Sequence, residues 1–337
     1  MRFRWWALSA VFLACGCGPS FHPQNEKELG DALRKGTGTV ILPPGTMEIT
    51  RELLVASGRD IEIRGSSSGS TLRLSENFQG RAALVFEHGS GISLKGFRID
   101  GRRETLAQPI GLPPSNVPFA RYYRNNGILA EDVRKLDILN VALANVANYA
   151  ILVSKCSRVR MRNLLVSDCG STKPGGRNNA SGGILFEEGT NGFEVQNCTL
   201  QRILGNAIWT HSNYGSPRNA GGSINANFIT EVARDAIQIG HATGMRVLAN
   251  RASRIGYPVE RVDMEGYGIP VALDTAGDVD RTVYRGNYFE DINGQCIDLD
   301  GFHAGEVREN RCVSPRPASE YPYEHYGIVM GNTNPDM

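Results

Sequence analysis

The residues best suited to acid–base chemistry lie in one short run, Cys296–His303, which reads CIDLDGFH. In a β-strand Asp298 and Asp300 would share one face with Cα atoms roughly 6.5 to 7 Å apart. Two close carboxylates repel, which raises the pKa of one so that it can donate a proton while the other stays ionised. Hydrolysis of a glycosidic bond needs such a pair. One alternative is structural: both carboxylates accept hydrogen bonds from N–H groups of a turn. Another is a calcium site, although the run lacks the remaining ligands of a calcium loop.

Other polar and aromatic residues could complete such a site, because a histidine near two aspartates can transfer a proton or hold a hydroxyl group. The residues to which we assign catalysis are Asp298, Asp300, His303, Asp274 and His211. Those to which we assign substrate binding are Trp209, Glu187, Gln238, His241, Tyr257, Tyr267 and Tyr326. For each histidine the alternative is an ordinary turn residue, and for Glu187 an unremarkable outward side chain.

A short sequence motif, the recurring phrase, repeats along the chain and must position these residues. It consists of a small residue, an Ile, a variable residue and another apolar residue. Its isoleucines are Ile128, Ile151, Ile184, Ile208, Ile237, Ile269, Ile297 and Ile328. After each of the first seven, a second short apolar run is followed by an Asn: Asn140, Asn163, Asn197, Asn227, Asn250, Asn287 and Asn310. The unit is about 23 residues long and contains short strands without helices between them, which indicates a solenoid of strands.

A solenoid predicts where the side chains point, because they alternate along each strand. With each Ile inward, the next residue points outward, as does the one two positions further on. The first outward column then contains Trp209, Gln238, Pro270 and Asp298, and the second contains Glu187, His211, Ala272 and Asp300. The Asn column is expected to be structural, because Asn tolerates left-handed backbone geometry and its amide can bond neighbouring turns.

Insertions between the repeats predict a groove on this face. Those at 171–182, 256–267 and 314–326 fall on one edge of the leading strand, and the one within 212–222 falls on the other. Their aromatic residues suit the flat faces of sugar rings: Tyr214, Tyr257, Tyr267, Tyr321, Tyr323 and Tyr326. An earlier insertion carries Arg121-Tyr122-Tyr123-Arg124, which we interpret as a solvated loop, with contact to an anionic sugar as the alternative.

The amino terminus, residues 1–17, is typical of an export signal, with Arg2 and Arg4 before a run of roughly ten apolar residues that is too short to span a bilayer. Its sequence FLAC, ending at Cys15, resembles a bacterial lipoprotein signal in which the Cys takes the lipid. Cys17 is the second candidate for that lipid. Ordinary secretion and a cytoplasmic location are the alternatives.

Composition excludes some classes of function. A net charge of +1 argues against a nucleic-acid role and against attraction to a membrane surface. The cysteines beyond the signal are expected to be small buried residues, and no CxxC or Cys/His spacing suggests zinc: Cys156, Cys169, Cys198, Cys296 and Cys312. We expect no required cofactor and leave Ca²⁺ open.

The start of the mature chain adds a family resemblance. Residues 18–36 are expected to form a linker and a capping helix over Glu26–Arg34, and residues 37–337 the solenoid. With its Val-Ile-Leu-Pro-Pro-Gly opening at Val40–Gly45, the chain resembles the right-handed parallel β-helix superfamily, which includes pectate lyases, polygalacturonases and many bacterial surface polysaccharide enzymes. The sequence contains no Asn-Thr-Asp, Asp-Asp, Gly-His-Gly or Arg-Ile-Lys motif of polygalacturonases, so the exact family stays unassigned.

Together these features predict an all-β, right-handed parallel β-helix that is exported, lipid-anchored and active on a polysaccharide, as a glycoside hydrolase with paired aspartates. A polysaccharide lyase or epimerase is one alternative, and a non-catalytic adhesion protein is another. We expect a polysaccharide partner, no nucleic acid, and membrane contact only through the lipid. Because Gly327 starts a new coil shortly before Met337, we also expect the chain to continue or a partner to cover the last coil.

Overall fold

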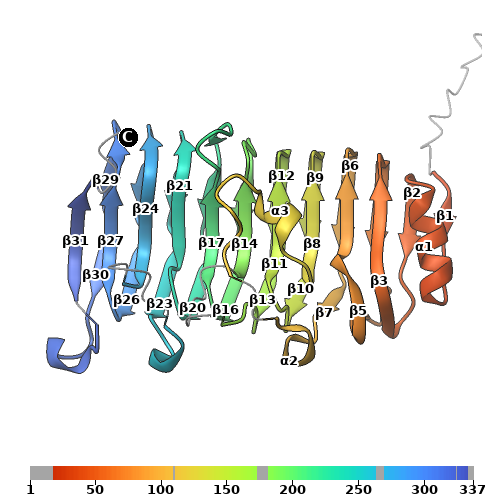
Figure 1. The fold of residues 1–337 in the computed structure, drawn as a ribbon, viewed down its shortest axis with the longest axis horizontal. Helices are drawn as coiled ribbons and strands as arrows, with labels where there is room; N and C mark the ends of the chain where they lie inside the picture. Colours follow the sequence, from red (N-terminus) through yellow and green to blue (C-terminus); the bar gives the residue numbers. More distant parts are fainter. Residues whose placement is uncertain (1–17, 109–110, 173–180, 263–268, 324, 333–337) are drawn as a thin grey trace, which may run out of the picture.

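The computed structural model describes residues 18–108, 111–172, 181–262, 269–323 and 325–332, which wind into stacked coils of parallel strands (Figure 1). A typical coil has three strands, such as β8 (Asn126–Glu131), β9 (Arg134–Leu139) and β10 (Ala142–Ala144). These pair in parallel with β11 (Tyr149–Ser154), β12 (Ser157–Arg162) and β13 (Leu165–Ser167) of the next coil. The predicted strand solenoid is therefore confirmed.

The stacked strands form three faces. The leading face, which carries the isoleucine phrase, contains β8, β11, β14 (Gly182–Glu187), β17 (Asn206–His211), β21 (Ile237–Thr243), β24 (Val271–Asp280), β27 (Gln295–Asp300), β31 (Tyr326–Gly331) and the later parts of β3 (Gly45–Ala56) and β5 (Ser70–Glu87). The second face contains β2 (Gly38–Ile41), β4 (Arg59–Arg64), β6 (Ser90–Lys95), β9, β12, β15 (Glu194–Gln196), β19 (Ser223–Asn225), β22 (Arg246–Leu248), β25 (Val283–Arg285) and β29 (Glu306–Arg308). The third face contains β7 (Arg98–Asp100), β10, β13, β16 (Thr199–Ile203), β20 (Phe228–Val232), β23 (Arg251–Ile255), β26 (Tyr288–Ile292), β30 (Arg311–Val313) and the earlier parts of β3 and β5.

The remaining elements are short. They are strands β1 (Ser20–Phe21), β18 (Asn219–Ala220) and β28 (Phe302–His303), helices α1 (Glu26–Arg34), α2 (Arg103–Leu106) and α3 (Phe119–Tyr122), and the 3₁₀ turns Val259–Arg261 and Ala318–Glu320. Helix α1 matches its predicted bounds and buries Leu29, Ala32 and Leu33 at one end of the stack, where Asn25 caps its first turn. Within the described ranges, no helix is both long and apolar enough to cross a bilayer.

The leading isoleucines stack inward as predicted, with Ile151, for example, in register between Ile128 and Ile184. One position of the predicted column is wrong. Leu273, and not Ile269, is in register with Ile237 and Ile297. The outward residues of that coil are therefore Asp274 and Ala276 instead of Pro270 and Ala272.

The Asn column is structural, but it is two columns that differ by one position. Asn140, Asn163 and Asn197 have φ near +53° to +55° and occupy a left-handed turn. Asn227, Asn250, Asn287 and Asn310 lie one position later and form a hydrogen-bonded ladder. The Oδ1 atom of Asn250, for example, accepts bonds from the backbone N and the Nδ2 of Asn227 at 3.0 and 2.9 Å.

Two of the cysteines are paired, which the sequence did not predict. Cys296 and Cys312 form a disulfide with Cα atoms 6.2 Å apart, joining β27 to β30 within one coil. Cys156, Cys169 and Cys198 are free and buried, as expected.

A second apolar cluster, the outer core, covers part of the leading face from outside. Its buried members are Ala82, Val85, Phe119, Ala120, Tyr123, Leu129, Tyr149, Leu152, Leu185 and Trp209. Three of them come from the segment around α3, which lies in front of the leading face (Figure 1). The solvated-loop interpretation of residues 121–124 therefore fits Arg121 and Arg124, which are exposed, and is wrong for Tyr123, which is fully buried.

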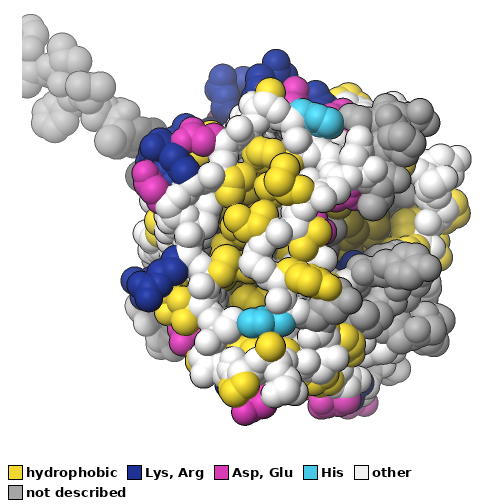
Figure 2. Space-filling view, turned by 90° about the vertical axis from the view of Figure 1, so that its left-hand side faces the viewer, with side chains coloured by type: hydrophobic (Ala, Val, Ile, Leu, Met, Phe, Trp, Pro, Cys, Tyr) yellow, Lys and Arg dark blue, Asp and Glu magenta, His cyan; other side chains and the backbone are white. Residues whose placement is uncertain are grey.

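The opposite end of the stack from α1 exposes apolar side chains (Figure 2). In β31, Ile328 is 58% exposed and Met330 is 79% exposed. Ile328 lies in register with Ile297 of β27, so it continues the inward ladder to the surface of this last described strand.

Candidate functional site

Five of the residues assigned from the sequence line one small pocket of about 230 Å³ on the leading face: Trp209, His211, Gln238, His241 and Asp300. They come from three coils, through β17, β21 and β27. Tyr214, from the insertion after β17, lines the same pocket. The repeat therefore predicted correctly that these residues lie close together.

The corrected register places a third aspartate in the column beside this pocket. Gln238 is in register with Asp274, and Leu273 is in register with Ile297. Asp274 therefore lies next to Asp298 on the adjacent coil, where parallel strands are about 4.8 Å apart. Asp298 has one carboxylate neighbour across the coils and another, Asp300, along its own strand.

A buried chain of amides holds Asp274. Asn206 Nδ2 donates to Gln238 Oε1 at 2.6 Å, and Gln238 Nε2 donates to Asp274 Oδ2 at 2.6 Å. The backbone N of Asp235 in turn donates to Asn206 Oδ1 at 3.2 Å. The sequence interpretation missed Asn206 and Asp235, although both occupy the same place, just before the small residue of the recurring phrase. The chain fixes Asp274 in one orientation beside Asp298.

Burial changes the proton affinity of these carboxyls. The pKa of Asp274 is well above its usual range because the side chain is buried, and the charges of Asp235 and Asp298 raise it further. Burial, followed by the charge of Asp300, raises the pKa of Asp298 to about 6. Asp298 therefore keeps its proton to a higher pH than an ordinary aspartate and is suited to donate it.

The two histidines of the pocket are neutral near pH 7. Burial lowers the pKa of His211 to about 4, with a further contribution from the nearby His241. Burial also lowers the pKa of His241. Their ring centroids are 6.1 Å apart. Neutral imidazoles can accept a hydrogen bond from a sugar hydroxyl or take up a proton.

Comparison with known proteins identifies the fold that carries these residues. A family model described as a right-handed beta helix region matches residues 115–269. The chain has the fold of a right-handed parallel β-helix. A search among curated proteins found no similar sequence.

Solved structures agree with this assignment over most of the β-helix. DFA-IIIase from Arthrobacter chlorophenolicus A6, solved without its lid, is 13% identical with a TM-score of 0.58, over 94% of this chain and 90% of that one. The surface adhesin PfbA of Streptococcus pneumoniae is 13% identical with a TM-score of 0.56, over 90% and 95%. ORF18 of Geobacillus virus E2 is 12% identical with a TM-score of 0.58, over 90% of this chain but 56% of that chain's length. An enzyme and an adhesin share the fold, so the likeness shows the fold alone.

Glu187 lies in the outward column, in register with His211, but it is fully covered, so its assignment to substrate binding is wrong. Its side chain is fully buried under the segment around α3. Its Oε2 accepts the backbone N–H of Phe119 at 2.8 Å, and its Oε1 accepts that of Ala120 at 2.9 Å. The carboxylate thus anchors α3 to the leading face, a role that sequence could not indicate because Phe119 lies 68 residues away.

The stability of the protein should depend on the ionisation of this buried carboxyl group, because burial of the charged form is unfavourable. Burial raises the pKa of Glu187 from 4.5 to about 7. The pKa of Glu187 is higher in the folded protein than in the unfolded chain, so the protonated side chain favours the folded state. This contribution to stability is complete below pH 4.5 and is lost as pH rises through about 7. We expect the free energy of unfolding to fall by about 3 kcal/mol across this window. Thermal unfolding at pH 5 and pH 8 would measure it.

Glu187→Gln should remove this pH dependence, and the control Glu194→Gln, a change on the second face, should keep it. Amide hydrogen exchange at Phe119 and Ala120 would report on α3 itself. Equal pH dependence in the Glu187→Gln variant and the wild-type protein would contradict the assignment.

Other assigned residues lie outside the pocket. His303 is exposed on β28, beyond Gly301, whose φ of +73° turns the chain away from β27. Tyr257 lines a different pocket, with the guanidinium groups of Arg254 and Arg316 over its ring at 5.1 and 5.4 Å. His303 and Tyr257 therefore do not lie in the pocket with the other assigned residues, contrary to the prediction from the sequence.

Three further assignments have mixed outcomes. Trp209 is only 8% exposed, because Phe119 packs against its ring with centroids 5.4 Å apart, so it forms a wall of the pocket and offers little surface to a substrate. Tyr326 is 46% exposed on the leading face, in register with Gln295. Tyr267 lies outside the described residues. Among the residues described, no group of three His, Cys, Asp or Glu side chains is arranged to hold a metal ion.

Proposed function

We propose that this β-helix protein binds a polysaccharide and hydrolyses it, with Asp298 as the proton donor and Asp300 as the base or nucleophile. One observation carries the proposal. Asp298 is flanked by Asp274 and Asp300 on the outward face of the leading strands, and Asp300 lines a pocket together with two neutral histidines. Paired carboxyls with separated pKa values are what glycosidic cleavage requires.

The chemistry is a two-carboxyl hydrolysis. Asp298 gives its proton to the glycosidic oxygen as the bond to the anomeric carbon breaks. Asp300 either takes a proton from the attacking water or attacks the anomeric carbon itself, after which water releases the sugar. Asp274, held by Gln238 at 2.6 Å, lines the site beside Asp298, while His211 and His241 hold sugar hydroxyls.

The proposal places the protein outside the cytoplasm, with a lipid on Cys15 or Cys17. The disulfide between Cys296 and Cys312 supports this location, because such bonds persist in oxidising compartments. Mass spectrometry of the amino-terminal peptide from a bacterial host, together with membrane fractionation, would test it. A chain that stays in the soluble cytoplasmic fraction with an unprocessed amino terminus would contradict the export.

The reaction itself is tested with a panel of neutral and acidic polysaccharides. We expect at least one of them to release new reducing ends without the ultraviolet absorbance of an unsaturated product. Absorbance would instead identify a lyase, and a changed sugar configuration without cleavage an epimerase. Binding without turnover across the panel would support an adhesion protein.

A further inference from the structure

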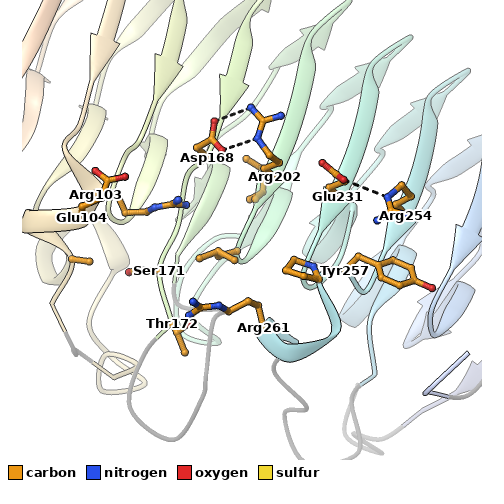
Figure 3. Close-up of a pocket in the computed structure, with 14 residues that line it drawn as sticks. Arg103, Glu104, Asp168, Ser171, Thr172, Arg202, Glu231, Arg254, Tyr257 and Arg261 are labelled. Carbon is orange, nitrogen blue, oxygen red and sulfur yellow. Dashed lines mark hydrogen bonds and ion pairs between the residues drawn. The ribbon is translucent and has the colours of Figure 1, made fainter.

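A second and larger pocket, of about 690 Å³, lies where the third face turns into the leading face (Figure 3). Its walls are the ends of β16, β20 and β23, the helix α2 and the turn Val259–Arg261. It shares no lining residue with the pocket of the aspartates. It is therefore a separate candidate site.

Charges of alternating sign form one wall of this arginine pocket. Asp168, Arg202, Glu231 and Arg254 occupy the same left-handed turn position in four successive coils, with φ between +54° and +58°. Arg202 donates two bonds to Asp168, at 2.7 and 2.8 Å, and Arg254 lies 3.4 Å from Glu231. The bond from Arg202 also lowers the pKa of Asp168, so this carboxylate stays ionised. The wall is consequently close to neutral.

Two further arginines extend into the space from opposite sides. Arg103, on α2, and Arg261, at the end of the 3₁₀ turn, point their guanidinium groups toward the middle of the pocket (Figure 3). Arg103 makes no ion pair within the described part of the chain. The lining includes four arginines, and two of them, Arg202 and Arg254, already face a carboxylate of the wall.

We infer that the arginine pocket binds an acidic oligosaccharide, whose carboxylate is held between Arg103 and Arg261. Guanidinium groups recognise carboxylates through paired hydrogen bonds. Apolar lining residues give a sugar ring's C–H groups a surface to pack on: Ala107, Ile203, Leu204 and Pro258. The volume lies within the range of ligand pockets. The inference depends on the proposed function only in that the ligand is a glycan.

The test is calorimetric binding of trigalacturonate to the full chain, compared with its fully methyl-esterified form and with inorganic phosphate. Esterification removes the charges but keeps the rings and linkages. We expect the acid to bind and the ester to bind at least about tenfold more weakly, since a charge-assisted bond is lost. Equal binding of acid and ester, or equally tight binding of phosphate, would overturn the inference, as would no binding of trigalacturonate.

Variants locate the site. Arg103→Met and Arg261→Met should each weaken binding of trigalacturonate about tenfold or more, and Arg160→Met, on the exposed second face, should leave it unchanged. Unchanged affinity in both pocket variants, with unchanged thermal unfolding, would overturn the assignment. Either variant can carry the test if the other does not fold.

The outcome is separable from that of the proposed function. The two sites have separate readouts, binding of trigalacturonate for the arginine pocket and turnover for Asp298, because the two pockets share no lining residue. If no glycan is turned over but Arg103→Met still weakens binding, the hydrolysis proposal fails and the arginine pocket stands. If turnover depends on Asp298 but the arginine variants bind trigalacturonate normally, the hydrolysis proposal stands and the arginine pocket fails.

Discussion

Replacing Asp298 with Asn should lower kcat on the cleaved glycan by about 10³-fold, the usual contribution of a positioned proton donor. Asp300→Asn should have an effect of similar size, because the amide can neither activate water nor attack carbon. The measurement is release of reducing ends by purified variants whose thermal unfolding matches that of the wild-type protein. Asp137→Asn, on the second face, is the matched control. Full turnover by both site variants would show that the site is elsewhere.

The pH profile distinguishes the two roles. Activity should decline as pH rises above about 6, because Asp298 must be protonated and its pKa is about 6. Burial is the larger cause of that value and the charge of Asp300 the next. The residual activity of Asp300→Asn should therefore lose its basic limb at lower pH than the wild-type protein. An unshifted limb would assign the titration to another group.

Replacing Asn250 with Leu should lower the free energy of unfolding by about 4 kcal/mol, since several buried polar groups lose their partners at once. The Oδ1 of Asn250 accepts two bonds from Asn227, and its Nδ2 donates to the carbonyl of Ile224 at 2.8 Å and to Asn287 at 3.0 Å. A leucine side chain has no hydrogen-bond donor or acceptor, so all of these groups would lose their partner. Denaturant unfolding would measure the loss.

Asn197→Gly is the control, because Asn197 belongs to the same sequence pattern but is exposed in a left-handed turn with φ of +53°. Glycine adopts that geometry freely, so the change should stay within about 0.5 kcal/mol. Equal losses in Asn250→Leu and Asn197→Gly would contradict the distinction between ladder and turn.

Periodic features were predictable from the sequence. Each leading Ile repeats the same relation to its coil, and α1 shows an apolar stripe at Leu29, Ala32 and Leu33, so local patterning was enough for both. The pocket followed as well, because outward positions in adjacent coils must stack. Trp209, Gln238 and Asp300 therefore met as expected.

Features that depend on insertions were not predictable. The segment before β24 shifted the inward position from Ile269 to Leu273, which moved Asp274 beside Asp298. A shift of one residue likewise separated the buried Asn250 from the turn residue Asn163, because sequence spacing does not show which of two adjacent positions turns inward. Glu187 is buried by the segment around α3. This segment is an insertion, so the repeat does not predict where it packs.

The position of α3 also closes one side of the pocket and leaves the other side open. Phe119 packs against both Trp209 and His211, with ring centroids 5.4 and 5.1 Å apart, so the outer core closes the pocket on the side of the earlier coils. In the proposed reaction, a chain-like ligand that passes Asp298 can continue over β31 in one direction, but in the other it can reach only as far as His211, where its terminus faces α3. If the proposed hydrolysis is correct, the anchored segment and not the aspartates sets the number of sugar units on that side, and with it the choice between chain ends and chain interiors.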